Sequence, residues 1–260
     1  MPEAREGLRV EGLTIKYGGN TAVNEVALSA PVGHITGLIG PNGAGKTTTF
    51  NACSGLLRPT EGRVHLFGKD VTRRPASHRA RMGLGRTFQL MQLVPSMTVQ
   101  SNVRIGAESR LVGGNPIKLV FGRPQEARAV NDAAEEALEV CGIGDLAQRS
   151  VGTLSTGQRR LVELARVLAG GYDLLLLDEP SSGLDEDETG RFGNVLLEAV
   201  AERGVGILLV EHDMGLVMRV CERIFVLDFG KLLFEGTAQE VRESVVVRAA
   251  YLGEEELVGT

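Results

Sequence analysis

The chain has 260 residues, 43% of them hydrophobic, which is enough to bury a core as one large α/β domain or two small ones. The net charge of −5 argues against a nucleic-acid-binding protein, which would usually present a basic face. No apolar run approaches the roughly 18 residues that span a bilayer, and the first residues lack the apolar segment of a signal peptide. The three cysteines and four histidines have no metal-ligand or redox spacing, which indicates packed, reduced thiols.

Two strand-like runs open the chain, at residues 8–16 and 23–28, with a turn at 17–20 between them. Tyr17 is the first residue of this turn. Its ring could stack on a purine base, although an aromatic residue next to a hairpin turn more often packs against its neighbours. Both interpretations stay open on the residues alone.

The next segment fits the phosphate-binding pattern G-x-x-x-x-G-K-[ST] at every fixed position, with Gly40, Pro41, Asn42, Gly43, Ala44, Gly45, Lys46, Thr47 and Thr48. A strand-like run precedes it and apolar residues at helical spacing follow it. The glycines allow the backbone to fold around an anion with its N–H groups pointing inward. A helix starting near Lys46 adds the positive end of its dipole. We expect Lys46 to contact the outer phosphates of a nucleotide and the Thr47 hydroxyl to bind Mg²⁺.

The stretch from residue 63 to 124 is less regular. A strand at 63–67 is followed by five arginines between residues 73 and 86, which could face phosphate or an anionic membrane but more often form a solvated helix face. Residues 87–99 are apolar without a clear period, so they either fold into the core or contact a partner. Residues 106–124 are predicted to be an irregular insertion.

Three helices are predicted in the second half of the chain. The first runs from about residue 125 to 141. The second begins at Ser155, which has with Gln158 the S-x-x-Q spacing of a capping box. The third follows the acidic run at 185–188 and ends at Gly204.

Two predicted strands in this half end in polar residues. The leucines at 174–177 do not alternate with polar residues, which indicates a strand buried on both faces of a parallel sheet. A second strand, at 207–210, leads to His212. Because ligands of such a sheet bind at the carboxyl ends of its strands, we expect Asp178, Glu179 and His212 to converge with the phosphate loop.

Each of these side chains has a role in a phosphate site. Asp178 can hold Mg²⁺ opposite Thr47, directly or through water. Glu179 is placed to orient a water molecule against the γ-phosphate; as an ionised carboxylate it is a weak base, so its main service would be alignment. His212 either bonds the γ-phosphate and Glu179 or caps the next helix.

The order of these motifs resembles that of the ATP-binding subunits of ABC transporters, and the resemblance covers nearly the whole chain. The signature motif of that family is similar to Leu154–Gln158, its Walker B strand to Leu174–Asp178 and its D-loop to Ser181–Asp185. Tyr17 is at the position of the family's adenine-stacking aromatic residue, Gln89 at that of its Q-loop glutamine, and His212 at that of its switch histidine. The resemblance therefore favours stacking by Tyr17 and phosphate contact by His212, and it adds Gln89 to the Mg²⁺ ligands.

The resemblance implies a fold and a domain organisation. The fold is an α/β P-loop NTPase with a RecA-like parallel sheet core, an N-terminal antiparallel β part and an inserted α-helical subdomain, all in a single nucleotide-binding domain. The expected core covers about residues 7–90 and 165–236, the helical subdomain about 91–164, and a C-terminal tail 237–260.

A head-to-tail dimer of two such subunits, identical or different, is implied as well, with ATP and Mg²⁺ as cofactors. The signature helix would close on the ATP of the opposite subunit with Ser155, Thr156, Gly157 and Gln158, beside the D-loop residue Asp185. Thr156 replaces the first glycine usual in the signature. Its backbone amide is retained, so contact with the γ-phosphate should survive with less room.

Membrane partners follow from the same resemblance. Family transporters receive a coupling helix from a membrane subunit just after the Q-loop glutamine, so we interpret Leu90, Met91, Leu93 and Met97 as a docking surface for transmembrane permease subunits. The chain would be peripheral, at the cytoplasmic face of the cell membrane. A solute-binding protein would take part only indirectly, and no nucleic-acid partner is expected.

Within this family, the chain is similar to the ATPases of branched-chain amino-acid importers. The similarity lies in residues 83–89 and 97–99, in the long gap between the Q-loop glutamine and the signature, and in the ending at 250–254. ATPases of urea import and of lipopolysaccharide export share parts of this pattern and are the alternatives. A soluble ABC ATPase acting on nucleic acid would usually carry coiled-coil insertions, tandem cassettes or basic surfaces. A small-molecule kinase with the same loop would not need residues 155–158.

Overall fold

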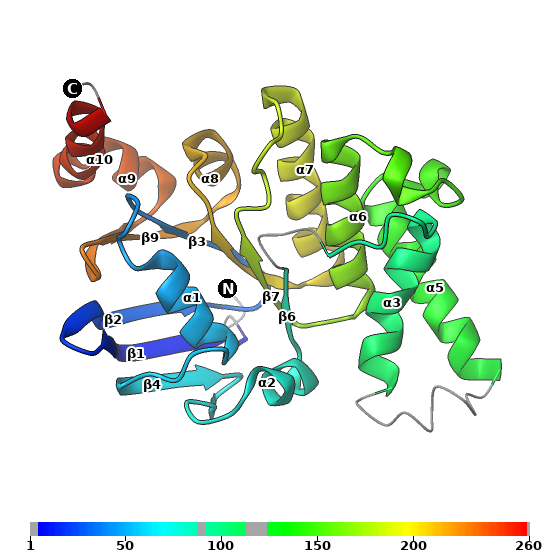
Figure 1. Cartoon of the computed structure of the whole chain (residues 1–260), viewed down its shortest axis with the longest axis horizontal. Helices are drawn as coiled ribbons and strands as arrows, with labels where there is room; N and C mark the ends of the chain where they lie inside the picture. Colours follow the sequence, from blue (N-terminus) through cyan, green and yellow to red (C-terminus); the bar gives the residue numbers. More distant parts are fainter. Residues whose placement is uncertain (1–4, 88–91, 113–123, 259–260) are drawn as a thin grey trace.

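A mostly parallel sheet forms the centre of the molecule. The computed structural model describes residues 5–87, 92–112 and 124–258 (Figure 1). The six strands of the sheet follow the order β10-β9-β3-β8-β7-β6, and these neighbours are parallel except β10 and β9. The strands are β3 Ile35–Ile39, β6 Leu84–Arg86, β7 Leu174–Asp178, β8 Gly206–Val210, β9 Arg223–Asp228 and β10 Lys231–Gly236.

A second, antiparallel sheet is built from the N-terminal part of the chain. It has the order β2-β1-β4-β5, with β1 Leu8–Tyr17, β2 Asn20–Ala30, β4 Glu61–Leu66 and β5 Lys69–Asp70. The predicted hairpin is confirmed, since β1 and β2 pair from Leu8 with Ala30 to Tyr17 with Asn20. The expected α/β fold with an N-terminal antiparallel part is therefore confirmed.

The central strand β7 is buried on both faces. Its side chains alternate between two cores, because successive side chains of a strand point to opposite faces. Leu174 and Leu176 join the core between the two sheets, whereas Leu175 and Leu177 join the core formed with the helices. All four are fully buried. This confirms the prediction drawn from the run of leucines.

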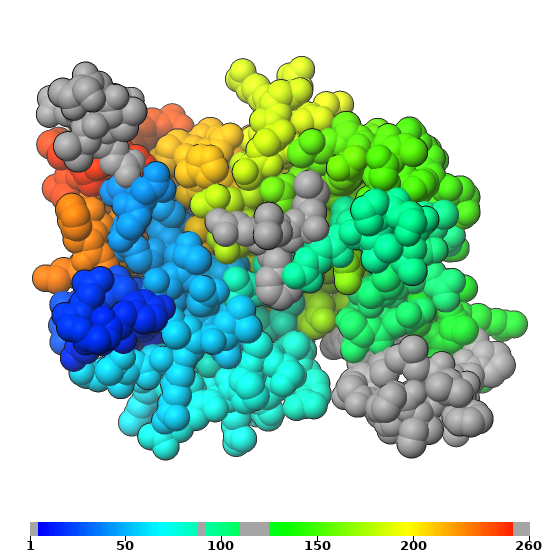
Figure 2. Space-filling model, in the orientation of Figure 1, coloured from blue at the N-terminus to red at the C-terminus, as the bar shows by residue number. Residues whose placement is uncertain are grey.

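Helices pack on both faces of the parallel sheet. α1 (Lys46–Ser54) joins the core between the sheets through Phe50, Ala52 and Cys53. Figure 2 shows the green middle part of the chain as one block, beside the blue and cyan part that contains α1. The remaining helices are α2 Ala76–Met82, α3 Val99–Val112, α5 Pro124–Val140, α6 Thr156–Ala169, α7 Glu186–Arg203, α8 Met214–Val220, α9 Ala238–Glu243 and α10 Val245–Val258, with 3₁₀ turns η1 Gly144–Leu146 and η2 Val151–Thr153.

The three predicted helices are confirmed as α5, α6 and α7. The irregular insertion predicted at 106–124 is wrong for its first residues, because α3 continues to Val112. None of the helices within the described ranges is long and apolar enough to cross a bilayer.

One arginine of the predicted solvated face is buried. Arg73, Arg74 and Arg81 are exposed, but Arg79 is only 1% exposed. The last carbonyl groups of a helix lack partners in the next turn, and Arg79 donates to two of those at the end of α1. Its guanidinium donates to the carbonyl oxygens of Ala52 and Cys53 at 2.7 Å, of Val71 at 2.8 Å and of Arg74 at 3.1 Å.

The substitution Leu175→Ala tests the two-sided burial of β7. We expect it to lower the free energy of unfolding by about 2–5 kcal/mol, because the surrounding core can only partly fill the cavity. Leu197→Ala is the control, since Leu197 is 41% exposed on α7 and its loss should cost less than about 0.5 kcal/mol. Urea denaturation followed by circular dichroism measures both variants. Equal losses would contradict the placement of Leu175 in the core.

Candidate functional site

The phosphate-binding pattern forms the loop between β3 and α1. Gly40 and Gly45 have φ angles of 148° and 95°, which residues with a Cβ atom rarely adopt. A Cβ at Gly40 would collide with the carbonyl oxygen of Leu227, and one at Gly45 would lie 2.8 Å from that of Ala22. The loop therefore has a conformation that requires glycine at both positions, and it packs closely against neighbouring strands.

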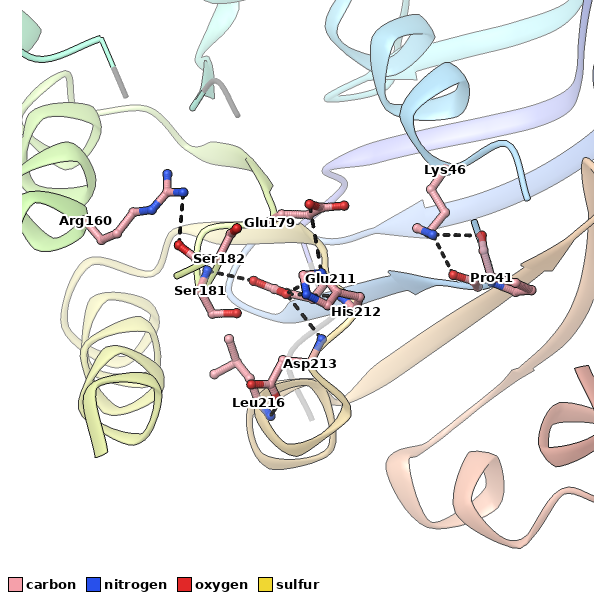
Figure 3. A network of polar contacts seen from close by, with 11 residues as sticks. Pro41, Lys46, Arg160, Glu179, Ser181, Ser182, Glu211, His212, Asp213 and Leu216 are labelled. Atoms are coloured by element: carbon pink, nitrogen blue, oxygen red, sulfur yellow. Dashed lines mark hydrogen bonds and ion pairs between the residues drawn. The ribbon is translucent and has the colours of Figure 1, made fainter. Parts of the chain in front are cut away.

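Lys46 directs its charge into this loop. Its side chain is buried, and Nζ donates to the carbonyl oxygens of Gly40 and Pro41, the latter at 3.0 Å (Figure 3). The ammonium group thus lies at the start of α1, where the helix dipole also favours an anion. Of the other loop residues named above, Asn42, Gly43 and Thr47 are exposed, Gly45 and Thr48 are partly buried, and Gly40, Pro41 and Ala44 are buried.

The turn between β9 and β10 supports the loop from the other side. Gly230 N donates to the carbonyl oxygen of Ala44 at 3.1 Å, and the carbonyl oxygen of Gly230 accepts from Asn24 N at 2.7 Å. The phosphate loop is therefore fixed between a strand near the start of the chain and a turn near its end.

Asp178 ends β7 and is 2% exposed. Burial raises the pKa of its carboxyl group; Arg86 opposes this shift, Glu179 and Glu211 add to it, and Lys46 opposes it. The Arg86 guanidinium lies 3.9 Å from Oδ2. Oδ1 accepts no hydrogen bond from the residues that the structure describes. A buried carboxylate oxygen without a donor fits a ligand of a hard cation.

Glu179 and His212 come from two neighbouring strand ends and lie close together. Glu179 N donates to the carbonyl oxygen of Val210 at 2.8 Å, and the residue has a positive φ of 47°, a conformation that is often associated with functional sites. Its Oε2 lies 3.9 Å from Nδ1 of His212, whose side chain is 62% exposed. The alternative that His212 caps the next helix is wrong, because Asp213 caps α8 by accepting from Leu216 N at 3.0 Å.

The capping box predicted at the start of α6 is confirmed. Ser155 Oγ accepts from Gln158 N at 3.2 Å, and Gln158 Oε1 accepts from Ser155 N at 3.1 Å. Thr156 between them is exposed. Arg160, one turn further along α6, lies well apart from Lys46 in Figure 3. The structure therefore does not bring this motif to the phosphate loop of the same chain.

Asp185 lies beside the motif instead. Its Oδ1 accepts from Glu188 N at 2.7 Å, and Glu188 Oε2 accepts from Asp185 N at 3.4 Å, which makes a capping box for α7. The Glu188 carboxylate also packs against Gly157, where a Cβ atom would collide with it. The starts of α6 and α7 thus form a second group of the predicted site residues.

The remaining predicted residues are Tyr17 and those of the segment from residue 89 to 97. Tyr17 ends β1 and is 54% exposed, so its ring is accessible to a ligand. Gln89, Leu90 and Met91 lie outside the described residues. Of the predicted docking surface, Leu93 is partly buried and Met97 is exposed.

Two charged residues of this region were missed in the sequence. Arg86 stacks over the ring of Phe50, 4.6 Å from its centroid, and donates to Ser54 Oγ at 2.7 Å in addition to facing Asp178. Glu211 is fully buried directly after β8. The sequence offered one signal for Glu211, since a charged residue that directly follows an apolar strand lies at a strand end, where ligands bind.

A glycine-rich loop with a lysine after one parallel strand, and a buried aspartate after the next strand but one, define the class of P-loop NTPases. The chain matches the family model described as ABC transporter over residues 23–182. It also matches the model described as Branched-chain amino acid ATP-binding cassette transporter over residues 231–256.

Individual relatives agree with this class. The high-affinity branched-chain amino acid transport ATP-binding protein BraF of Pseudomonas aeruginosa is 39% identical over 96% of this chain and 99% of its own length. LivG of Escherichia coli, which has the same description, is 39% identical over 95% of this chain and 98% of its own length.

Solved structures share the fold. The ADP conformation of MJ1267, an ATP-binding cassette of an ABC transporter, has a TM-score of 0.83 at 31% identity, covering 95% of this chain and 99% of that chain. A dimeric, post-hydrolysis state of the cassette MJ0796, bound to ADP and Pi, has a TM-score of 0.73 at 25% identity, covering 89% and 98%. The chain belongs to the ATP-binding subunits of ABC transporters, which makes it a nucleotide-binding transport ATPase.

Asp178→Asn tests the cost of burying the Asp178 carboxylate. Burial raises the pKa of this group, so the folded state is penalised where the carboxylate is ionised, and the penalty disappears as the pH falls through the raised pKa. Without nucleotide and in EDTA, Asp178→Asn should therefore have a higher Tm than the unmodified protein at neutral pH. The difference should shrink toward about pH 4.

Thermal unfolding over this pH range measures the effect. Asp132→Asn on α5 is the matched control, because Asp132 is exposed and its neutralisation removes no burial cost. A Tm of Asp178→Asn below that of the unmodified protein at every pH would contradict the expected penalty.

Proposed function

We propose that this subunit drives the import of branched-chain amino acids. The observation that carries the proposal is the similarity to BraF, which extends over 96% of the chain and is joined by the C-terminal match to the branched-chain family model. The chain would be peripheral, at the cytoplasmic face of the cell membrane. Permease subunits would form the pathway, and a solute-binding protein would deliver the amino acid to them.

In this proposal ATP binds across the phosphate loop together with Mg²⁺. The loop N–H groups and Lys46 would bind the phosphates, and Tyr17 would stack on the adenine. Thr47, Asp178 and Gln89 would hold Mg²⁺, which neutralises phosphate charge when bound. Among the described residues no group donates to Oδ1 of Asp178, which supports this role.

Hydrolysis would depend on Glu179 and His212. Glu179 would align the attacking water, and its αL backbone fixes where the carboxylate leaves the strand end. His212 would bond the γ-phosphate, since its ring is exposed and its Nδ1 lies 3.9 Å from the Glu179 carboxylate.

A second subunit would complete the site. The residues from Ser155 to Gln158 begin α6, and Arg160 of the same helix lies well apart from Lys46 of the phosphate loop (Figure 3). A helix start attracts anions. We infer that it binds the γ-phosphate of an ATP held by the partner subunit, with Asp185 at the same interface. The related cassette MJ0796 has a dimeric structure, which supports the presence of a second subunit.

Permease subunits would dock at residues 89–97. Next to the described part of this segment is a cavity of about 170 Å³, whose lining includes Thr87, Gln92, Ile105, Ser109, Arg166 and Tyr172. Arg166 donates to the carbonyl oxygen of Gln92 at 2.6 Å and so ties the segment to α6. The cavity would lie between a core of about residues 7–90 and 165–236 and a helical subdomain of about 91–164, with the tail 237–260 outside both.

Glu179→Gln should keep ATP binding, trap a dimer in Mg-ATP and slow hydrolysis by about 10²–10⁴-fold, because the amide is a much weaker acceptor for the water proton. Size-exclusion chromatography and phosphate release measure the two effects. Lys46→Ala is the comparison, since it should lose tight nucleotide binding and stay monomeric. Hydrolysis by Glu179→Gln at the normal rate would show that another group aligns the water.

Uptake assays test the cargo. Cells that lack this chain should lose uptake of leucine, isoleucine and valine at low concentration and keep uptake of urea. The unmodified chain should restore uptake and Lys46→Ala should not. Loss of urea uptake or of lipopolysaccharide export instead would assign a different cargo. Salt-sensitive binding to nucleic acid, without co-sedimenting membrane subunits, would favour the nucleic-acid class.

A further inference from the structure

Glu211 has no role in the proposed mechanism, although it lies between the residues that carry it. It directly follows β8 and precedes His212, and its side chain is 0% exposed. Burying a carboxylate is costly unless its oxygens are hydrogen-bonded. The hydrogen-bond partners of Glu211 therefore indicate the role of this buried carboxylate.

Both oxygens of Glu211 accept hydrogen bonds from backbone amides. Oε1 accepts from Ser181 N at 2.8 Å, and Oε2 accepts from the N–H groups of His212 at 3.1 Å and Asp213 at 3.4 Å (Figure 3). Oε2 also lies 3.9 Å from His212 Nδ1, and Oε2 of Glu179 lies at the same distance from that nitrogen. The imidazole is thus near two carboxylates, one fully buried and one partly exposed.

These bonds join the loop after β7 to the loop after β8. Ser181 belongs to the first loop, in which Ser182 N donates to the carbonyl oxygen of Glu179 at 3.2 Å. His212 and Asp213 belong to the second loop. A displacement of either loop would break bonds to the same carboxylate, so Glu211 makes the two loops depend on each other.

We infer that Glu211 is a positioning residue, which holds the Glu179 carboxylate and the His212 imidazole in a fixed relation during hydrolysis. This inference rests on the proposed roles of Glu179 and His212. A carboxylate accepts on both oxygens, whereas glutamine has one acceptor oxygen and an NH₂ group that would face a backbone N–H. Glu211→Gln therefore releases one loop, whichever way its amide is turned.

Steady-state ATPase kinetics test this role. Glu211→Gln should lower kcat by at least about tenfold, because charge-assisted bonds to one loop are lost, while KM for ATP stays within about twofold. In the His212→Ala background the same substitution should lower kcat by less than about threefold, because the relation it maintains is already gone. Hydrogen exchange should become faster in the peptides around Ser181 and His212 together.

Asn102→Asp is the matched control. Asn102 is also fully buried, and its side chain bonds the backbone of Val94 and Thr98, away from the strand ends. It should lower Tm and speed exchange around residues 94–102 without a selective loss of kcat. If Glu211→Gln does not fold, Glu211→Asp replaces it, since the shorter carboxylate keeps its charge but cannot reach both loops.

An unchanged kcat, or losses that simply add in the double variant, would overturn the role of Glu211. Normal hydrolysis by Glu179→Gln would remove the proposed mechanism and this role with it. Slow hydrolysis by Glu179→Gln with normal hydrolysis by Glu211→Gln would remove the positioning role alone.

Discussion

A strand that is buried on both faces can carry charged side chains only at its ends, and the whole site depends on this constraint. Every residue of β3, β7 and β8 is buried. The three strands are parallel neighbours, so their carboxyl ends lie at one edge of the sheet. The phosphate loop, Asp178 with Glu179, and Glu211 with His212 follow these ends directly. Charged residues far apart in the chain meet there because these three strands carry no charged side chain elsewhere.

The two buried carboxylates at this edge differ in the hydrogen bonds that they accept. Glu211 accepts three backbone N–H bonds. Asp178, equally buried, has one oxygen without a donor among the described residues and a pKa raised by burial. The first carboxylate bonds two loops, and the second has an oxygen open to the Mg²⁺ that we propose there, at a cost to stability. Arg160 extends the held region to α6, since it donates to the carbonyl oxygen of Ser182 at 3.3 Å.

The features of this site that depend on residues close together in the sequence could be predicted from it. The phosphate loop, the four leucines of β7 and the capping box at Ser155 each depend on residues a few positions apart. The rest depends on distant partners. The residues around Arg79 predict a solvated helix face, and Arg79 is buried because it donates to carbonyl groups at the end of α1. Glu211 gives no local sign of Ser181 as its partner, and α3 escaped prediction because its apolar residues form no strong stripe.

Thr156 departs from the family signature at a position where the packing leaves room. Its side chain is exposed, and its methyl group is 3.6 Å from where a Cβ of Gly183 would lie, an ordinary contact distance. At the next position, Gly157, a Cβ would collide with the Glu188 carboxylate, which the capping box of α7 holds in place. A side chain therefore fits at position 156, whereas only glycine fits at position 157. Because a Cβ restricts the backbone, Thr156 stiffens the start of α6 while keeping the N–H that a partner's nucleotide would meet.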